Sequence, residues 1–145
     1  MHVALGADHA GFQLKDALTQ ALDEIGATYQ DFGTSTDASV DYPDFAAAVA
    51  TGVAGGRFDR GILVCGSGVG MAIAANKIAG VRAAPIGDVE SARLAREHND
   101  LNVLTLGARR TSPEEARAIV QAFLQTPFAG GRHQRRVEKI SRLES

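Results

Sequence analysis

ILVCGSGVGMAIAANK, residues 62–77, decides the fold of this 145-residue chain. An apolar run ends at Cys65, the only cysteine of the sequence. With Arg60 and Gly61 in front of it, this run is typical of a central strand in a parallel sheet, which is buried on both faces. Three glycines at positions 66, 68 and 70 follow, and then a stretch of small and apolar residues that favours a helix. The stretch therefore predicts a strand, a glycine loop and a helix, in that order.

The same alternation of strand and helix extends in both directions from this stretch. Its signals are apolar periodicity, glycine stops and helix caps, including a capping box in which Ser112 precedes Pro113 and Glu115. Five such alternations in one domain of residues 1–145 predict an open α/β sheet of about five parallel strands with helices on both faces, followed by a C-terminal helix. Strands are expected at 2–6, 28–32, 60–65, 80–87 and 101–107, and helices at 12–26, 44–56, 70–78, 88–100, 113–125 and 133–143.

The composition excludes several classes of protein. A single cysteine excludes a disulfide framework within the chain and a cysteine-rich metal site, and a free thiol suits a reducing compartment. No apolar run reaches the ~18 residues of a membrane span, and no leader pattern opens the sequence. We therefore expect a cytoplasmic protein that has no membrane partner.

The charge of the chain is unevenly distributed. Residues 1–60 carry nine acidic and three basic side chains, and residues 61–145 carry eight acidic and twelve basic ones. The basic second part favours an anionic ligand. The overall net charge of −2 argues against nucleic acid as a partner.

Residues that could bind a ligand or take part in a reaction follow three of the predicted strands. Asp8 and His9 follow the first strand, the glycine loop follows the third, and Arg109 and Arg110 follow the last. Ligands of open α/β sheets bind beyond the carboxyl ends of the strands. We therefore expect these residues to share one site.

The glycine loop itself predicts contact with an oxygen of a ligand. Closely spaced glycines allow backbone N–H groups to approach a phosphate, a carboxylate or a developing oxyanion. The alternative is a tight turn without function. Position 71 is methionine, which fits neither a Walker A loop nor the dinucleotide fingerprint. Asp88, about twenty residues further on, keeps a nucleotide-binding module as an alternative.

Several side chains could carry proton transfer or bind an anion. Cys65 is either a buried apolar residue or, at a helix N-terminus, a thiol whose pKa is lowered. Ser67 offers a hydroxyl that can carry a proton. A histidine beside an acid, as in Asp8-His9, suits proton transfer near neutral pH, although a surface loop is the alternative.

The C-terminal half offers two further candidates. His98, at a predicted helix end, is either functional or only favoured by the helix dipole. Arg132 and Arg136 share one helix face and could bind a phosphate, or they could belong to a solvated basic helix.

Five segments together resemble the type B ribose-5-phosphate isomerases, a family that includes allose-6-phosphate and galactose-6-phosphate isomerases. They cover nearly the whole chain and occur in the family's order. They are GADHAG (residues 6–11), DYPDFA (41–46), CGSGVGMAIAANK (65–77), REHND (96–100) and GGRHQRRV (130–137). The resemblance implies a Rossmann-like sheet, a homodimer or homotetramer with sites at subunit boundaries, and aldose–ketose isomerisation of sugar phosphates without metal or cofactor.

The resemblance also implies roles for individual residues. Cys65 would be the base that moves a proton between the carbons flanking the new carbonyl, because Ala74 and Ala75, just past the loop, are not acidic as in relatives that use glutamate. Ser67 would shuttle protons between the substrate oxygens. Gly66, Gly68 and Gly70 would bracket an oxyanion hole, and Asp8 and His98 would bind and open the sugar ring. Phosphate contacts would come from His9, Arg132 and Arg136. Tyr42, Asn99 and Arg109 would line the site, with Asn99 and Arg109 reaching a neighbouring subunit's site.

Ribose 5-phosphate is the expected substrate, interconverted with ribulose 5-phosphate through ring opening and an enediolate. Allose 6-phosphate and galactose 6-phosphate are alternative substrates. A non-catalytic nucleotide- or sugar-phosphate-binding module is the alternative from another class, and fold alone does not exclude it. Such a module needs the arginines and the loop, but it has no need of Cys65, Ser67 and His98.

Overall fold

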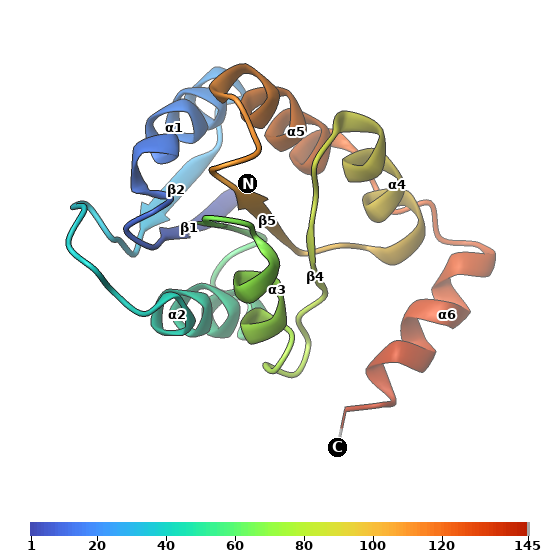
Figure 1. Cartoon of the computed structure of the whole chain (residues 1–145). Coiled ribbons are helices and arrows are strands. Elements are labelled where there is room, and N and C mark those ends of the chain that lie inside the picture. Colours follow the sequence, from blue (N-terminus) through green and yellow to red (C-terminus); the bar gives the residue numbers. More distant parts are fainter. Residues whose placement is uncertain (145) are drawn as a thin grey trace.

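The computed structural model, which describes residues 1–144, contains an all-parallel five-stranded sheet with helices on both faces (Figure 1). The strand order β2-β1-β3-β5-β4 places the quoted strand at the centre. This confirms the expected fold class. The elements are β1 (His2–Ala7), a 3-10 turn η1 (Phe12–Leu14), α1 (Lys15–Glu24), β2 (Thr28–Asp31), α2 (Tyr42–Ala54), β3 (Arg60–Cys65), α3 (Val69–Ala75), β4 (Ala83–Pro85), α4 (Val89–Asn99), β5 (Val103–Gly107), α5 (Pro113–Gln125) and α6 (Arg132–Ser141).

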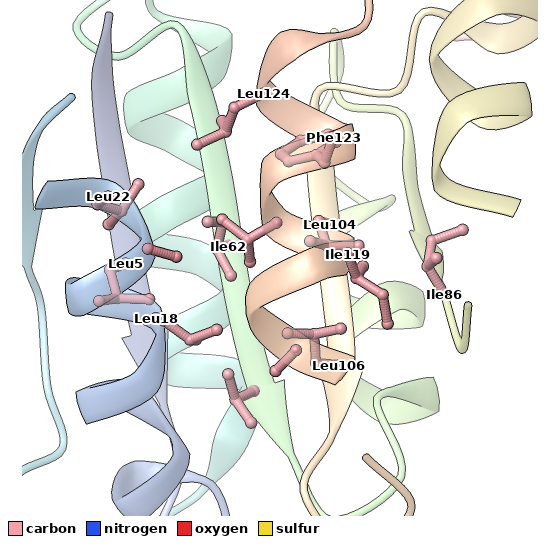
Figure 2. Close-up of a cluster of buried hydrophobic side chains, with 14 of the residues drawn as sticks. Leu5, Leu18, Leu22, Ile62, Ile86, Leu104, Leu106, Ile119, Phe123 and Leu124 are labelled. Atoms are coloured by element: carbon pink, nitrogen blue, oxygen red, sulfur yellow. The ribbon is translucent and has the colours of Figure 1, made fainter. Parts of the chain in front are cut away.

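The central strand β3 is apolar on both sides because both sides are covered. Ile62 and Val64 belong to a core cluster with α1 and α5, whereas Leu63 and Cys65 belong to a second cluster with α2 and α3. Figure 2 shows the first cluster, in which leucines of α1 and aliphatic side chains of α5 pack over β1, β3 and β5. The period of two along β3 therefore directs the Cys65 side chain toward the α2–α3 face.

Helix α6 lies apart from the sheet. It packs against α4 (Figure 1), and just after its C-terminal end the Glu144 carboxylate accepts the N–H of Gly80 at 2.9 Å. Val137 is its only buried residue, while Ile140 is exposed on the same helix. No helix within residues 1–144 is long and apolar enough to span a membrane.

Two strand predictions were too long by more than one residue. The expected strand 80–87 is reduced to Ala83–Pro85, and the expected strand 101–107 begins only at Val103. Asn102 lies where both strands begin, and its side chain accepts the N–H of Arg82 and donates to the carbonyl of Gly80. These side-chain bonds hold the segment before β4 outside a regular ladder, although the Asn102 N–H still donates to the Arg82 carbonyl at 3.1 Å.

The capping box predicted before α5 is confirmed. The Ser112 hydroxyl accepts the Glu115 N–H at 3.1 Å, and the Glu115 carboxylate accepts the Ser112 N–H at 3.1 Å. We expect Ser112→Ala to lower the free energy of unfolding by about 1 kcal/mol, because one N–H of the first turn loses its acceptor. Urea unfolding measures this change, and Ser112→Asp, which keeps a capping oxygen, should retain most of the stability. Equal loss in both variants would contradict the capping role.

Candidate active site

The carboxyl ends of three strands, β1, β3 and β5, lie side by side at one end of the sheet. Ala7 pairs with Val64, and Cys65 pairs with Gly107. Asp8 therefore continues β1 beside Cys65, and its backbone N–H donates to the Val64 carbonyl at 3.1 Å. The register confirms the expectation that the residues after β1, β3 and β5 share this end of the sheet.

Cys65 is nearly buried and carries a hydrogen bond on its sulfur. Its residue is 5% exposed, and the backbone N–H of Gly68 donates to Sγ at 3.1 Å. An N–H donor at this position is an interaction that a negatively charged sulfur strengthens. The surroundings of the thiol thus combine an apolar strand below it with a polar loop above it.

Two glycines of the loop leave room for side chains that lie against it. A Cβ on Gly66 would meet the Arg109 guanidinium at 3.0 Å, and a Cβ on Gly70 would meet the Tyr42 ring at 2.6 Å. Tyr42, which precedes the loop in the sequence, and Arg109, which follows it, therefore both lie against the loop. Arg109 thus lies against Gly66 of its own chain, and the expectation that it reaches a neighbouring subunit's site stays a prediction.

Gly68 is glycine for a conformational reason. Its φ of +80° lies in the left-handed region, and a Cβ there would also meet the Leu106 backbone at 3.0 Å. Its carbonyl accepts the hydroxyl of buried Thr105 at 2.7 Å. The loop is thus fastened to β5 by contacts that residues 65–70 alone do not reveal.

Thr105 was not among the predicted site residues, and replacing it provides a test of the loop's anchorage. We expect Thr105→Val to lower the free energy of unfolding by about 1–2 kcal/mol, because the Gly68 carbonyl loses its hydroxyl donor in a buried setting. Denaturant unfolding measures the change. Thr105→Ser, which keeps the hydroxyl, should be closer to the parent protein, and a valine variant as stable as the parent would show that this bond does not hold the loop.

Asp8 and His9 are both fixed by backbone N–H groups. Asp8 is 6% exposed, and its Oδ1 accepts the N–H groups of Ala10 at 2.9 Å and Gly11 at 3.1 Å. His9 accepts the Val40 N–H on Nδ1 at 3.1 Å, so the neutral ring carries its proton on Nε2. A second oxygen of Asp8 and one nitrogen of His9 remain available to a ligand.

The backbone N–H groups of the glycine loop differ in their partners, and the expected oxyanion hole stays a prediction. The Gly68 N–H points to the Cys65 sulfur and is not available to a substrate oxygen. Within residues 1–144 the N–H groups of Ser67 and Gly70 have no hydrogen-bond partner. These two N–H groups, beside the exposed Ser67 hydroxyl, can donate to an oxygen of a ligand.

A second group of predicted residues lies elsewhere in the chain. His98 and Asn99 end α4, and α6 carries Arg132 and Arg136 on its exposed surface. The two helices meet where the His98 ring stacks on His133, with ring centroids 4.3 Å apart and the planes inclined by 13°. His133 was not among the predicted residues, and only its place inside the motif at 130–137 could have indicated it.

The two groups lie at opposite ends of the strands: the first at the carboxyl ends, the second at the amino ends. Cys65 pairs with Gly107 at the carboxyl end of β5. His98 lies at the C-terminal end of α4, just before the amino end of β5 at Val103. Four residue steps of strand, roughly 13 Å at about 3.3 Å each, separate these ends. One copy of the chain therefore does not bring His98, Asn99, Arg132 and Arg136 to Cys65.

Comparisons with known proteins agree with this arrangement of fold and motifs. A family model described as Ribose/Galactose Isomerase matches residues 3–140. Ribose-5-phosphate isomerase B of Escherichia coli (strain K12) is 49% identical over 142 residues, which are 98% of this chain and 95% of that protein.

Solved structures are equally similar. Ribose-5-phosphate isomerase B of Clostridium thermocellum has a TM-score of 0.96 at 46% identity, covering 99% of this chain and 97% of that one. The Mycoplasma genitalium protein of the same name, with bound ribulose-5-phosphate, has a TM-score of 0.94 at 43% identity, covering 99% and 95%. With the family model matching nearly its whole length, the chain belongs to the ribose/galactose isomerase family.

Proposed function

We propose that this protein is a cytoplasmic aldose–ketose isomerase that interconverts ribose 5-phosphate and ribulose 5-phosphate. The observation that carries the proposal is the environment of Cys65: a nearly buried sulfur beside Asp8, at a loop whose Ser67 and Gly70 N–H groups have no partner within residues 1–144. The names of the relatives support the substrate, and the family membership supports the reaction class.

Cys65 is the proposed base. As thiolate it removes the proton from C2 of the open-chain aldose, and the electrons of that C–H bond form the C1–C2 double bond of an enediolate, with negative charge on O1. The same thiol returns the proton to C1 while the O2 proton moves to O1 by way of the Ser67 hydroxyl. The result is the ketose, with no change in the total number of protons or electrons.

Stabilisation of the enediolate falls to the loop. The Ser67 and Gly70 N–H groups belong to a loop that the Thr105 hydroxyl holds through the Gly68 carbonyl, with Tyr42 and Arg109 lying against it. Donors fixed before the reaction stabilise developing charge without reorganising, and loss of one such donor typically costs ~10²–10³ in rate. The Gly68 N–H acts on the sulfur instead, where it supports the thiolate.

Ring opening and phosphate binding require the second group of residues. A furanose ring opens when a proton leaves its anomeric hydroxyl and another reaches the ring oxygen, which suits Asp8 and His98 as a pair. Arg132 and Arg136 share a face of α6 and would hold the phosphate together with His9. The phosphate takes no part in bond changes, and its binding positions the reacting carbons.

We propose a homodimer, or a tetramer built from it, in which each site combines the two groups from different copies. The support is the separation of Cys65 from His98 within one copy, together with exposed apolar side chains next to each group. Val69 and Ile73 of α3 are 50% and 58% exposed beside the loop, and Ile140 of α6 is 44% exposed. A two-fold axis would complete two sites at once.

The test of the reaction is formation of ribulose 5-phosphate from ribose 5-phosphate by the purified protein in the presence of EDTA. We expect turnover that EDTA does not reduce. Turnover with allose 6-phosphate or galactose 6-phosphate, but not with ribose 5-phosphate, would keep the reaction class and change the substrate. Binding of sugar phosphates without turnover of any of them would favour the non-catalytic binding module.

A further inference from the structure

His133 contacts a residue of the proposed site without having a role in the mechanism above. It lies on the first turn of α6 and is half-buried, unlike its neighbours Arg132 and Gln134, which are exposed. Its ring covers one face of the His98 ring, with centroids 4.3 Å apart and nearly parallel planes. Stacking of this kind limits rotation of both rings about their side-chain bonds.

The backbone around His133 is shaped to place this ring. Gly130 and Gly131 have φ values of +65° and +56°, and the Gly130 carbonyl accepts the His133 N–H at 3.0 Å. Directly before this turn, the Ala129 N–H donates to the Glu97 carbonyl at 3.1 Å, which fixes the segment to the end of α4. The stack is therefore held from both of its helices.

Desolvation and nearby positive charges favour the neutral form of the His133 ring. Desolvation lowers the pKa of His133, and the positive charges of His98, Arg132 and Arg136 lower it further, against a smaller opposite effect of Glu97. A neutral His133 can lie against a protonated His98, whereas two cationic rings at this distance would repel each other.

We propose that His133 is a positioning residue, whose ring fixes the plane in which His98 presents its nitrogens to the sugar. This inference rests on the proposed function for its catalytic consequence. A histidine at the end of a helix, with one face open, could rotate about its side-chain bonds. With His133 on that face, the ring has one orientation before the substrate arrives, and a misplacement of about 1 Å in a reacting group can cost up to about 100-fold in rate.

Two variants separate the flat ring from simple volume. His133→Phe keeps a planar ring that can stack on His98, and His133→Leu fills space without one. We expect kcat for ribose 5-phosphate to fall about 10-fold in the leucine variant with KM within about twofold, because the phosphate contacts are unchanged. The phenylalanine variant should restore most of kcat. Arg135→Leu, an exposed neighbour on α6, controls for the effect of a leucine in this helix.

The second readout is NMR of the free protein, and it needs no substrate. The His98 ring protons should show the upfield ring-current shift of a stacked aromatic neighbour in the parent protein and in His133→Phe, and lose it in His133→Leu. Equal kcat in the leucine variant and the parent would overturn the proposal, as would unshifted His98 resonances in the parent. Absence of turnover in the parent together with shifted resonances would overturn the proposed function and leave the orientation of His98 by His133 standing.

The pH dependence of the stack gives a further check in the same spectra. Because the pKa of His133 is lower in the folded protein than in the unfolded chain, the unfolded chain binds more protons just below pH ~6.5. The contribution of neutral His133 to stability is therefore complete above pH ~6.5 and decreases as the pH falls through the folded pKa. The midpoint of His133 should rise in Arg136→Gln, which removes one of the positive charges. An unchanged midpoint would contradict this account of the charges.

Discussion

We expect Cys65→Ala to lower kcat for ribose 5-phosphate by about 10²–10⁴, the usual contribution of a positioned general base. Asp8 lies at the same ends of the strands, but its proposed role is ring opening, and two backbone N–H groups fix its Oδ1. KM should change little, because the phosphate contacts lie on other residues. The measurement is ribulose 5-phosphate formation, with Cys65→Ser as a second variant that keeps the size of the side chain but lacks a basic thiolate.

Val64→Ala is the matched control for damage to β3. Val64 precedes Cys65 on the same strand, is fully buried and points to the opposite face of the sheet. We expect it to lower the free energy of unfolding by about 2 kcal/mol through lost packing, with kcat close to that of the parent. If Cys65→Ala keeps its turnover, Cys65 is not the base. If Val64→Ala loses as much activity as Cys65→Ala, the loss in both comes from the strand.

The second large effect is recovery of activity when two inactive chains are combined. Cys65→Ala and His98→Ala should each have little activity, because each removes one half of every site. Co-expressed, half of the dimers would contain both chains, and each mixed dimer would have one intact site of two. We therefore expect about a quarter of the parent activity per site from random pairing. Purification through two different affinity tags should raise this fraction to about half.

A pair of variants from the same half of the site is the control. Cys65→Ala combined with Asp8→Ala should recover nothing, because every site in a mixed dimer then lacks one of these two side chains. Recovery in this control would show that the two residues belong to different halves. A lack of recovery with His98→Ala, in verified mixed dimers, would contradict a site shared between copies. The molar mass in solution, from light scattering, decides between a dimer and a tetramer.

The sequence predicted most of the fold because the relevant signals are local. The apolar run at 60–65, the glycines after it and the capping box at Ser112 each depend on neighbours within a few residues, and the structure confirms all three. Strand ends were less predictable. Where two of the strands begin, the Asn102 side chain bonds to residues about twenty positions away, and no pattern around position 102 indicates those partners.

The grouping of the site residues was only partly predictable. A helix between parallel strands returns the chain from the carboxyl ends to the amino ends of the strands. The position of His98 at the C-terminal end of a helix therefore already implied that it lies away from Cys65. Arg109 follows a strand, which by the same reasoning places it with Cys65 of its own chain, as the structure shows. Thr105 has no comparable signal, because it looks like any threonine in a buried strand.

The sequence by itself determined the order of strands and helices, the end of the sheet that carries the glycine loop, and the membership of a family, since periodicity and motif spacing are properties of neighbouring residues. Only the tertiary structure decided that the Gly68 N–H serves the sulfur of Cys65 and that the Thr105 hydroxyl holds the loop. It also decided that His133 covers His98. These contacts join residues through the packing of separate elements, and hydrogen bonds and ring stacking depend on distances of a few ångströms that no spacing along the chain determines.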